Sequence, residues 1–219
     1  MHFSVNYGHV EYVKLLFQHE GIKINQINQW GSTPLHTAVM KGEVECTKFL
    51  LTSNDININI NNNDDNTLFE LVVQYNHPEC LPLLLNHCYD NAQKELYPLH
   101  RAIMNNDVPT VTSLLNEPSI DLTTKDMNGW TPLYLSVALD NEEITTHLLQ
   151  QTNINVNKKN TDGKAPIDIA ALLSNPRILK VLLTQENIDV NRQNVVNFTA
   201  LHYAALAGRT DNIELLLNQ

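Results

Sequence analysis

Apolar residues recur along this chain at helical spacing, and they do so in the same order many times. Between Glu43 and Leu51, the residues Val44, Thr47 and Leu50 fall on one face of a helix. A pair of large apolar residues closes this helix, and such a pair returns at regular intervals: Leu16-Phe17, Leu50-Leu51, Leu84-Leu85, Leu114-Leu115, Leu148-Leu149, Leu182-Leu183 and Leu216-Leu217. The pattern predicts seven copies of one helical element.

A short segment in which apolar and polar residues alternate follows most of these helices, as in an extended loop. The copies are Ile22-Lys23-Ile24-Asn25, Ile56-Asn57-Ile58-Asn59, Ile120-Asp121-Leu122-Thr123, Ile154-Asn155-Val156-Asn157 and Ile188-Asp189-Val190-Asn191. The longer run over residues 56–66 could also be an aggregation-prone strand or an acidic cation site. Its alignment with the other loops favours a hairpin finger with Asp64 and Asp65 at the tip.

A second, shorter helix precedes each of these elements. In its clearest copy, Thr33 is a capping residue, Pro34 takes the first helical position, and Gly42 ends the helix. The step from Pro98 to Pro132, Pro166 and Ala200 is 34 residues each time, and a fixed period of this length marks a stacked repeat array. A small side chain occupies the same position in most copies, which lets the first helices approach closely: Ser4, Ala38, Ala102, Ser136, Ala170 and Ala204.

The order of turn glycine, Thr-Pro-Leu-His, small residue, glycine and paired leucines resembles the ankyrin repeat family. The resemblance covers the whole chain and is most complete in residues 26–59 and 192–219. It implies an all-α repeat solenoid in which helix-loop-helix units stack and short β-hairpin loops project from the first helices. Residues 1–219 then form one array of about seven repeats: 1–25, 26–59, 60–89, 90–123, 124–157, 158–191 and 192–219. The first and last repeats are incomplete, so we expect a segment of a longer protein.

The third repeat departs from the pattern. Its small position holds Val72, Pro82 falls several residues into the expected second helix, and the step to the next repeat is shorter than 34 residues. An interior proline removes an intrahelical hydrogen bond and shortens or kinks a helix. The sequence therefore predicts an irregularity over residues 76–95.

The net charge indicates which classes of partner suit the chain, and the cysteine content indicates which compartment suits it. The net charge is −10, which repels nucleic acid phosphates and anionic lipid, and no apolar run is long enough to span a membrane. Three scattered cysteines suit a reducing compartment. We expect an intracellular, cytoplasmic protein, located in a host cytosol if it is a secreted effector, with no nucleic acid partner and no membrane insertion.

Two groups of residues invite a chemical interpretation. His36, His100 and His202 occupy the same position in three repeats, so we expect hydrogen bonds from each imidazole to nearby turn backbone. The group His77, Cys80, His87 and Cys88 is a conceivable zinc set, although Cys80 aligns with Cys46 at an apolar helix position. There is no glycine-rich phosphate loop and no known catalytic signature. We expect no catalytic residue, no metal, no cofactor and no enzymatic activity.

The resemblance implies that a partner protein binds the concave face formed by hairpins and first helices. The residues at the variable positions of that face are Trp30, Met40, Lys41, Asp64, Tyr75, Lys94, Met104, Asn105, Met127, Trp130, Leu139 and Phe198. Aromatic and Met side chains are frequent among them, as in interface hot spots. For Trp130, packing against an adjacent finger is an equally good explanation.

We therefore expect a monomeric, non-catalytic protein-protein interaction module. The alternative is the targeting or substrate-recognition segment of a larger enzyme or a secreted bacterial effector. The resemblance also implies one modification: Leu183 and Asp189-Val190-Asn191 match the pattern by which asparaginyl hydroxylases recognise hairpin loops of the family, which makes Asn191 a possible hydroxylation site.

Overall fold

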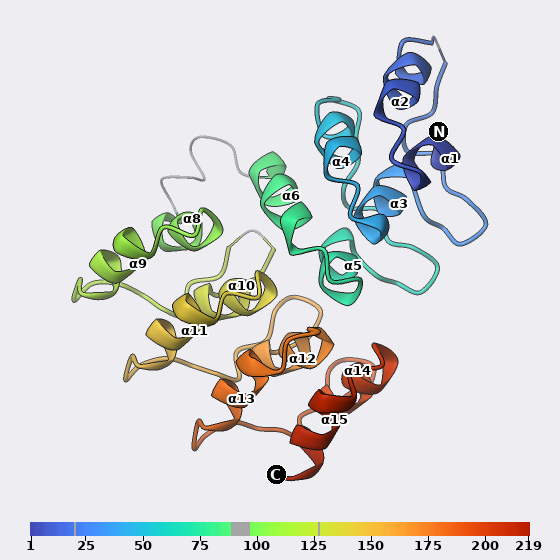
Figure 1. Cartoon of the computed structure of the whole chain (residues 1–219). Coiled ribbons are helices and arrows are strands. Elements are labelled where there is room, and N and C mark those ends of the chain that lie inside the picture. Colours follow the sequence, from blue (N-terminus) through green and yellow to red (C-terminus); the bar gives the residue numbers. More distant parts are fainter. Residues whose placement is uncertain (20, 89–96, 127) are drawn as a thin grey trace. The chain divides into compact units, whose positions relative to one another are not determined.

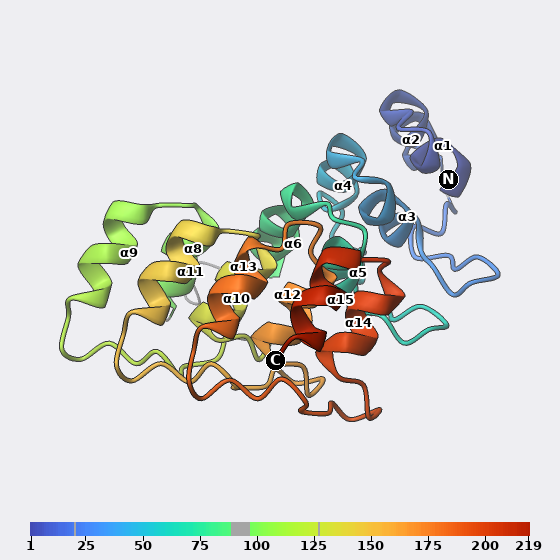
Figure 2. The same ribbon diagram turned by 60° about the horizontal axis from the view of Figure 1, so that its bottom comes forward.

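The computed structural model describes residues 1–19, 21–88, 97–126 and 128–219. The chain divides into two compact units, Met1–Asp90 and Asn91–Gln219. Within each unit, pairs of antiparallel helices lie side by side and long loops join one pair to the next (Figures 1 and 2). The described residues contain helices and turns and no strand, so the predicted all-α repeat solenoid is confirmed.

The described residues of the first unit, 1–19 and 21–88, form three helix pairs. They are α1 (His2–Asn6) with α2 (Val10–Phe17), α3 (Pro34–Lys41) with α4 (Val44–Leu50), and α5 (Leu68–Gln74) with the 3₁₀ turn η1 (Pro78–Cys80) and α6 (Leu81–Cys88).

The described residues of the second unit, 97–126 and 128–219, form four pairs. They are α8 (Pro98–Met104) with α9 (Val108–Leu115), α10 (Pro132–Ala138) with α11 (Glu142–Leu149), α12 (Pro166–Leu172) with α13 (Arg177–Leu183), and α14 (Ala200–Leu206) with α15 (Thr210–Leu217).

The first helix of a repeat begins where its sequence supplies a cap. At α3, Thr33 Oγ1 accepts a hydrogen bond from the His36 amide at 3.3 Å, and His36 Nδ1 accepts one from the Thr33 amide at 3.2 Å. Thr67 and Glu70 form the same reciprocal pair at α5, with the carboxylate in place of the imidazole. These caps satisfy backbone donors that have no partner within a helix.

Most first helices end on a residue with positive φ, which turns the chain back toward the second helix. Glycine fills this place at Gly8, Gly42 and Gly208, and Asn76, Asn106 and Asp140 fill it elsewhere. The amide of the next residue then bonds back to the carbonyl of the small position, as His9 does to Ser4, Glu43 to Ala38, His77 to Val72, Asp107 to Ala102, Asn141 to Ser136 and Arg209 to Ala204. Asparagine and aspartate adopt this left-handed backbone more easily than other residues with a Cβ.

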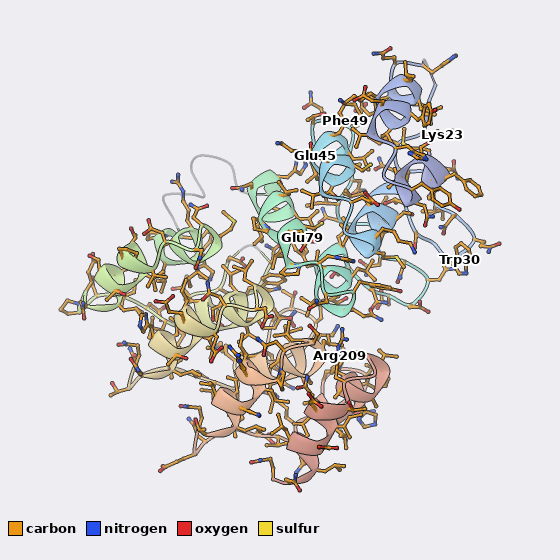
Figure 3. All side chains as sticks on the ribbon, viewed as in Figure 1. Lys23, Trp30, Glu45, Phe49, Glu79 and Arg209 are labelled. Atoms are coloured by element: carbon orange, nitrogen blue, oxygen red, sulfur yellow. The ribbon has the colours of Figure 1, made fainter. Side chains whose placement is uncertain are left out.

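Helix α12 ends differently, because Leu173 has extended backbone and no positive-φ residue follows it. Its last carbonyls are capped from the next repeat. Asn212 Nδ2 of α15 lies 3.3, 3.0 and 2.9 Å from the carbonyl oxygens of Ala170, Ala171 and Leu173. Arg209 Nε donates to the carbonyl of Leu172 at 2.8 Å, and Figure 3 marks Arg209 beside this helix. Side chains of one repeat thus complete the backbone of its neighbour.

The core of each unit runs along the stack between the two layers of helices. Neighbouring first helices contact each other more extensively than neighbouring second helices, as for α12 with α14 compared with α13 with α15. The small positions Ala38, Ser136, Ala170 and Ala204 are fully buried. Because a small side chain lets two helix backbones approach, this position sets the close packing of the first helices.

The irregular third repeat shows how a helix accommodates Pro82. This residue has no amide hydrogen to donate to the Pro78 carbonyl, and the Leu81 amide bonds to that carbonyl instead, which forms η1. The α-helix proper begins at Leu81, so Pro82 lies in its first turn and not in its interior. Residues 89–95, the rest of the predicted irregular segment, lie outside the described residues.

Candidate functional site

In five repeats, the described loop before the first helix ends in a five-residue turn closed by its first side chain. Asn28 Oδ1 accepts hydrogen bonds from the amides of Trp30 and Ser32 at 2.9 and 3.0 Å, and the Asn28 amide donates to the Ser32 carbonyl at 3.0 Å. Gly31 has a φ of 70°, as this turn requires. The same bonds recur in the turns that begin at Asn62, Asp126, Asn160 and Asn194.

Successive turns are fastened to each other. The Asn63 amide donates to the Trp30 carbonyl at 3.0 Å, and Asn63 Nδ2 donates to the Gln29 carbonyl at 3.1 Å. A Cβ at Gly31 would lie 2.7 Å from the Asn63 backbone nitrogen, so the close approach excludes any side chain there. In the second unit, Thr161 Oγ1 likewise donates to the Asn128 carbonyl at 3.3 Å. The turns therefore present their side chains from a rigid backbone.

The two tryptophans lie on opposite sides of the turn glycine and differ in exposure. Trp30 precedes Gly31 and is 64% exposed, on the loop between α2 and α3 where Figure 3 labels it. Trp130 follows Gly129, is only 4% exposed and packs against Tyr134 with ring centroids 5.0 Å apart. The two tryptophans therefore have different roles, and Trp130 belongs to the core.

A hollow of about 520 Å³ lies beside Trp30, between α1, α3 and the turn. It brings together three of the predicted binding residues, Trp30, Met40 and Lys41. The remaining lining residues are Met1, His2, Phe3, Asn6, Asn28, Ser32 and Thr37. A hollow of this size suits a side chain or a small ligand.

The other predicted residues do not line this hollow. Asp64, Tyr75, Asn105 and Phe198 are exposed, and Leu139 is half-buried. Met104 is buried inside its unit, so Met104 and Trp130 were wrongly predicted to be available to a partner. Their side chains point into the core because bulky residues fill the space between stacked repeats. Lys94 and Met127 lie outside the described residues.

More of the residues that line the hollow follow from the sequence when the two positions before the helix-ending glycine are also read in the first repeat. Met40 and Lys41 were selected as the two residues before Gly42, and Asn6 and Tyr7 hold the same places before Gly8. Asn6 lines the hollow and Tyr7 is exposed. Phe3, which aligns with Thr37, also lines it and is 82% exposed. The incomplete first repeat obscured this equivalence.

The histidines link repeats. His100 Nε2 lies 2.8 Å from the Trp130 carbonyl and His2 Nε2 lies 2.9 Å from the Ser32 carbonyl, each in the next turn. Burial lowers the pKa of His36 to about 4. Burial also lowers the pKa of His100, against the charge of Asp126. The imidazoles of His36 and His100 are therefore neutral at pH 7 and act as structural hydrogen-bonding groups.

The conceivable zinc residues have other contacts. Cys80 Sγ lies 3.9 Å from Thr47 Oγ1 in the core, and burial raises the pKa of the Cys80 thiol to about 11. His77 Nδ1 lies 3.2 Å from Glu79 Oε1. Within residues 1–19, 21–88, 97–126 and 128–219, no group of three or more metal-binding side chains converges.

Asparagines of the extended loops bridge consecutive repeats. Asn25 Nδ2 donates to the Asp55 carbonyl at 2.7 Å, and its Oδ1 accepts from the Asn57 amide at 2.9 Å. Asn157 makes the corresponding two bonds to the loop that contains Asn191. Asn191 is exposed, and its amide group bonds to no other residue in the described part of the chain.

Comparison with known proteins agrees with this architecture. A family model for ankyrin repeats (3 copies) matches residues 1–95, 69–160, 99–194 and 157–219, which together span the chain. The human ASB11 ankyrin repeat domain is 23% identical, with 99% of this chain and 96% of that chain aligned at a TM-score of 0.49. The ankyrin repeat domain of Bcl-3 is 25% identical, with 100% and 97% aligned at a TM-score of 0.46.

Two negative findings concern curated relatives and membrane-spanning helices. No curated protein matches the sequence. In the part of the chain that the structure describes, no helix has the length and apolar character needed to cross a bilayer.

Proposed function

Because the chain belongs to the ankyrin repeat family, whose members are generally protein-protein interaction modules, we propose that it binds a partner protein through the turns and first helices. The module itself is non-catalytic in this proposal and works as a monomer. The observation that carries the proposal is the exposed indole of Trp30 on a turn whose backbone is hydrogen-bonded within itself and to the next turn.

A side chain held this way suits an interface anchor. Tryptophan is the residue type most enriched among hot spots, and a rigid backbone lowers the conformational entropy lost on binding. The second unit offers a similar feature, since Val195 and Val196 are 75% and 60% exposed on the turn that begins at Asn194. Exposed apolar side chains therefore occupy equivalent turns in both units.

Affinity capture with matched variants tests the proposal. The tagged chain is incubated with cell lysate, and retained proteins are identified by mass spectrometry. We expect a specific partner to be retained by the wild type and by Tyr12→Ala, which alters an exposed aromatic residue of the second helix α2. The double variant Trp30→Ala and Val196→Ala should lose it. Retention by the double variant with loss by Tyr12→Ala would place the interface on the second helices.

A further inference from the structure

The hollow beside Trp30 combines apolar walls with one permanently charged side chain. Phe3, Trp30 and Met40 supply apolar surface, and Lys41 is the only lining residue with a permanently charged side chain. Lys41 is exposed in the last turn of α3 and forms no salt bridge with any residue in the described ranges. An ammonium group beside exposed aromatic surface is therefore open to a partner.

The His2 ring and the Asn28 side-chain oxygen, on the polar floor of the hollow, already have hydrogen-bond partners. His2 Nε2 lies 2.9 Å from the Ser32 carbonyl, and Asn28 Oδ1 accepts the amides of Trp30 and Ser32. A ligand gains little by offering hydrogen bonds to these groups, because they have partners. The floor therefore favours an apolar group, and the remaining chemical preference comes from Lys41.

The unit that surrounds the hollow is acidic, which sets the positive charge of Lys41 apart from its surroundings. Residues 1–90 contain four lysines, no arginine and ten carboxylates, yet no carboxylate lines the hollow. Lys41 carries the only permanently charged side chain among the lining residues, so its ammonium is the side-chain charge within direct reach of a ligand in the hollow. A carboxylate on the partner complements Lys41, whereas a cation there is repelled.

We propose that this hollow receives a segment of a partner protein in which a large apolar side chain stands next to a carboxylate. The apolar side chain packs against Trp30, Phe3 and Met40, and the carboxylate pairs with Lys41. This inference rests on the proposed function and specifies the chemistry of one part of the interface.

A displayed library of random dodecapeptides tests the proposal at 0.15 M salt. We expect selection against the wild-type chain to enrich Leu, Met, Phe or Trp next to Asp or Glu. Trp30→Ala should lower the affinity of the chain for the enriched peptides about 30-fold, as expected for the loss of an interface anchor. Lys41→Met should weaken them a few-fold. Selection against Lys41→Glu should exchange the acidic residue for Lys or Arg, an outcome that a purely structural effect would not produce.

Two control variants distinguish loss of the proposed contacts from a general loss of folding or binding. Tyr12→Ala removes an exposed aromatic ring outside the hollow, and Lys48→Glu reverses an exposed charge on α4. Both should bind the peptides like the wild type, and all variants should unfold at similar denaturant concentrations. Enriched apolar peptides without an acid, or an unchanged preference in Lys41→Glu, would overturn the proposal.

Other outcomes identify other occupants. Self-association that Trp30→Ala abolishes would assign the hollow to a second copy of the chain and overturn the peptide proposal. Failure to enrich any peptide would also overturn it. Peptides that bind Trp30→Ala normally but lose affinity in Val196→Ala would overturn this inference while supporting the proposed function, because binding would then use turns of the second unit.

Discussion

Replacing Asn212 by alanine should cost the chain much more stability than its position in a terminal helix suggests. Asn212 is 1% exposed, and its Nδ2 group serves the carbonyls of Ala170, Ala171 and Leu173 at the end of α12. Four other repeats place a buried apolar residue at the equivalent position: Cys46, Cys80, Ile144 and Ile178. The polar side chain is needed here because α12 lacks the positive-φ residue that ends most first helices.

The magnitude follows from the bonds that are lost. An amide has two hydrogens, and each hydrogen bond contributes about 0.5–1.5 kcal/mol, while a buried group left without a partner costs about 1–3 kcal/mol. We therefore expect Asn212→Ala to lower the free energy of unfolding by about 2–4 kcal/mol. Arg209 still bonds to the Leu172 carbonyl and limits the damage to the neighbouring carbonyls.

Urea denaturation followed by circular dichroism measures the loss. Asn218→Ala is the matched control, since Asn218 is exposed just after the same helix α15, and it should change stability by less than about 0.5 kcal/mol. Hydrogen exchange should also quicken at the end of α12. Equal, small effects of both substitutions would refute the cross-repeat cap.

Three further outcomes follow from the structure. Burial raises the pKa of Asp168 to about 6, so between about pH 4 and 6 the folded state keeps a proton that the unfolded state releases, and the free energy of unfolding falls as pH rises through this range. Urea unfolding of Asp168→Asn should lack this fall, and at pH 7 its free energy of unfolding should exceed that of the wild type by roughly 2 kcal/mol. Trp130→Ala should cost about 3–5 kcal/mol in the same assay, and Trp30→Ala less than about 0.5. Incubation with an asparaginyl hydroxylase, iron and 2-oxoglutarate should add oxygen at Asn191 before Asn157, whose amide is hydrogen-bonded; peptide mapping that finds Asn157 modified first would contradict this order.

Much of the fold was predictable because its signals are local. Thr33 and Pro34 start a helix, Gly42 ends it, and the paired leucines close the next one, so each signal lies at the helix end that it sets. Because the motif repeats, its incomplete copies could be recognised by alignment with the complete ones. Asp65, which takes the positive-φ place of Gly31, was recognisable mainly by alignment with the other turns.

The candidate site was less predictable, because exposure depends on packing between repeats. Counting from the turn glycine placed Trp30 and Trp130 together as contact residues, but Trp30 precedes its glycine and is exposed, whereas Trp130 follows its glycine, two positions further along the turn, and is buried. Met104 was misplaced for the same reason. The cap that Asn212 supplies to α12 was also hidden, since about 40 residues separate donor and acceptors.

Hydrogen exchange with and without a captured partner tests the central proposal most directly. We predict slower exchange in the turns at 28–32 and 194–198 and in the last turns of the neighbouring first helices, where the exposed apolar side chains lie. The second helices should exchange at unchanged rates. Protection confined to second helices such as α4, α11 and α13, with the turns unaffected, would contradict binding through the turns and first helices.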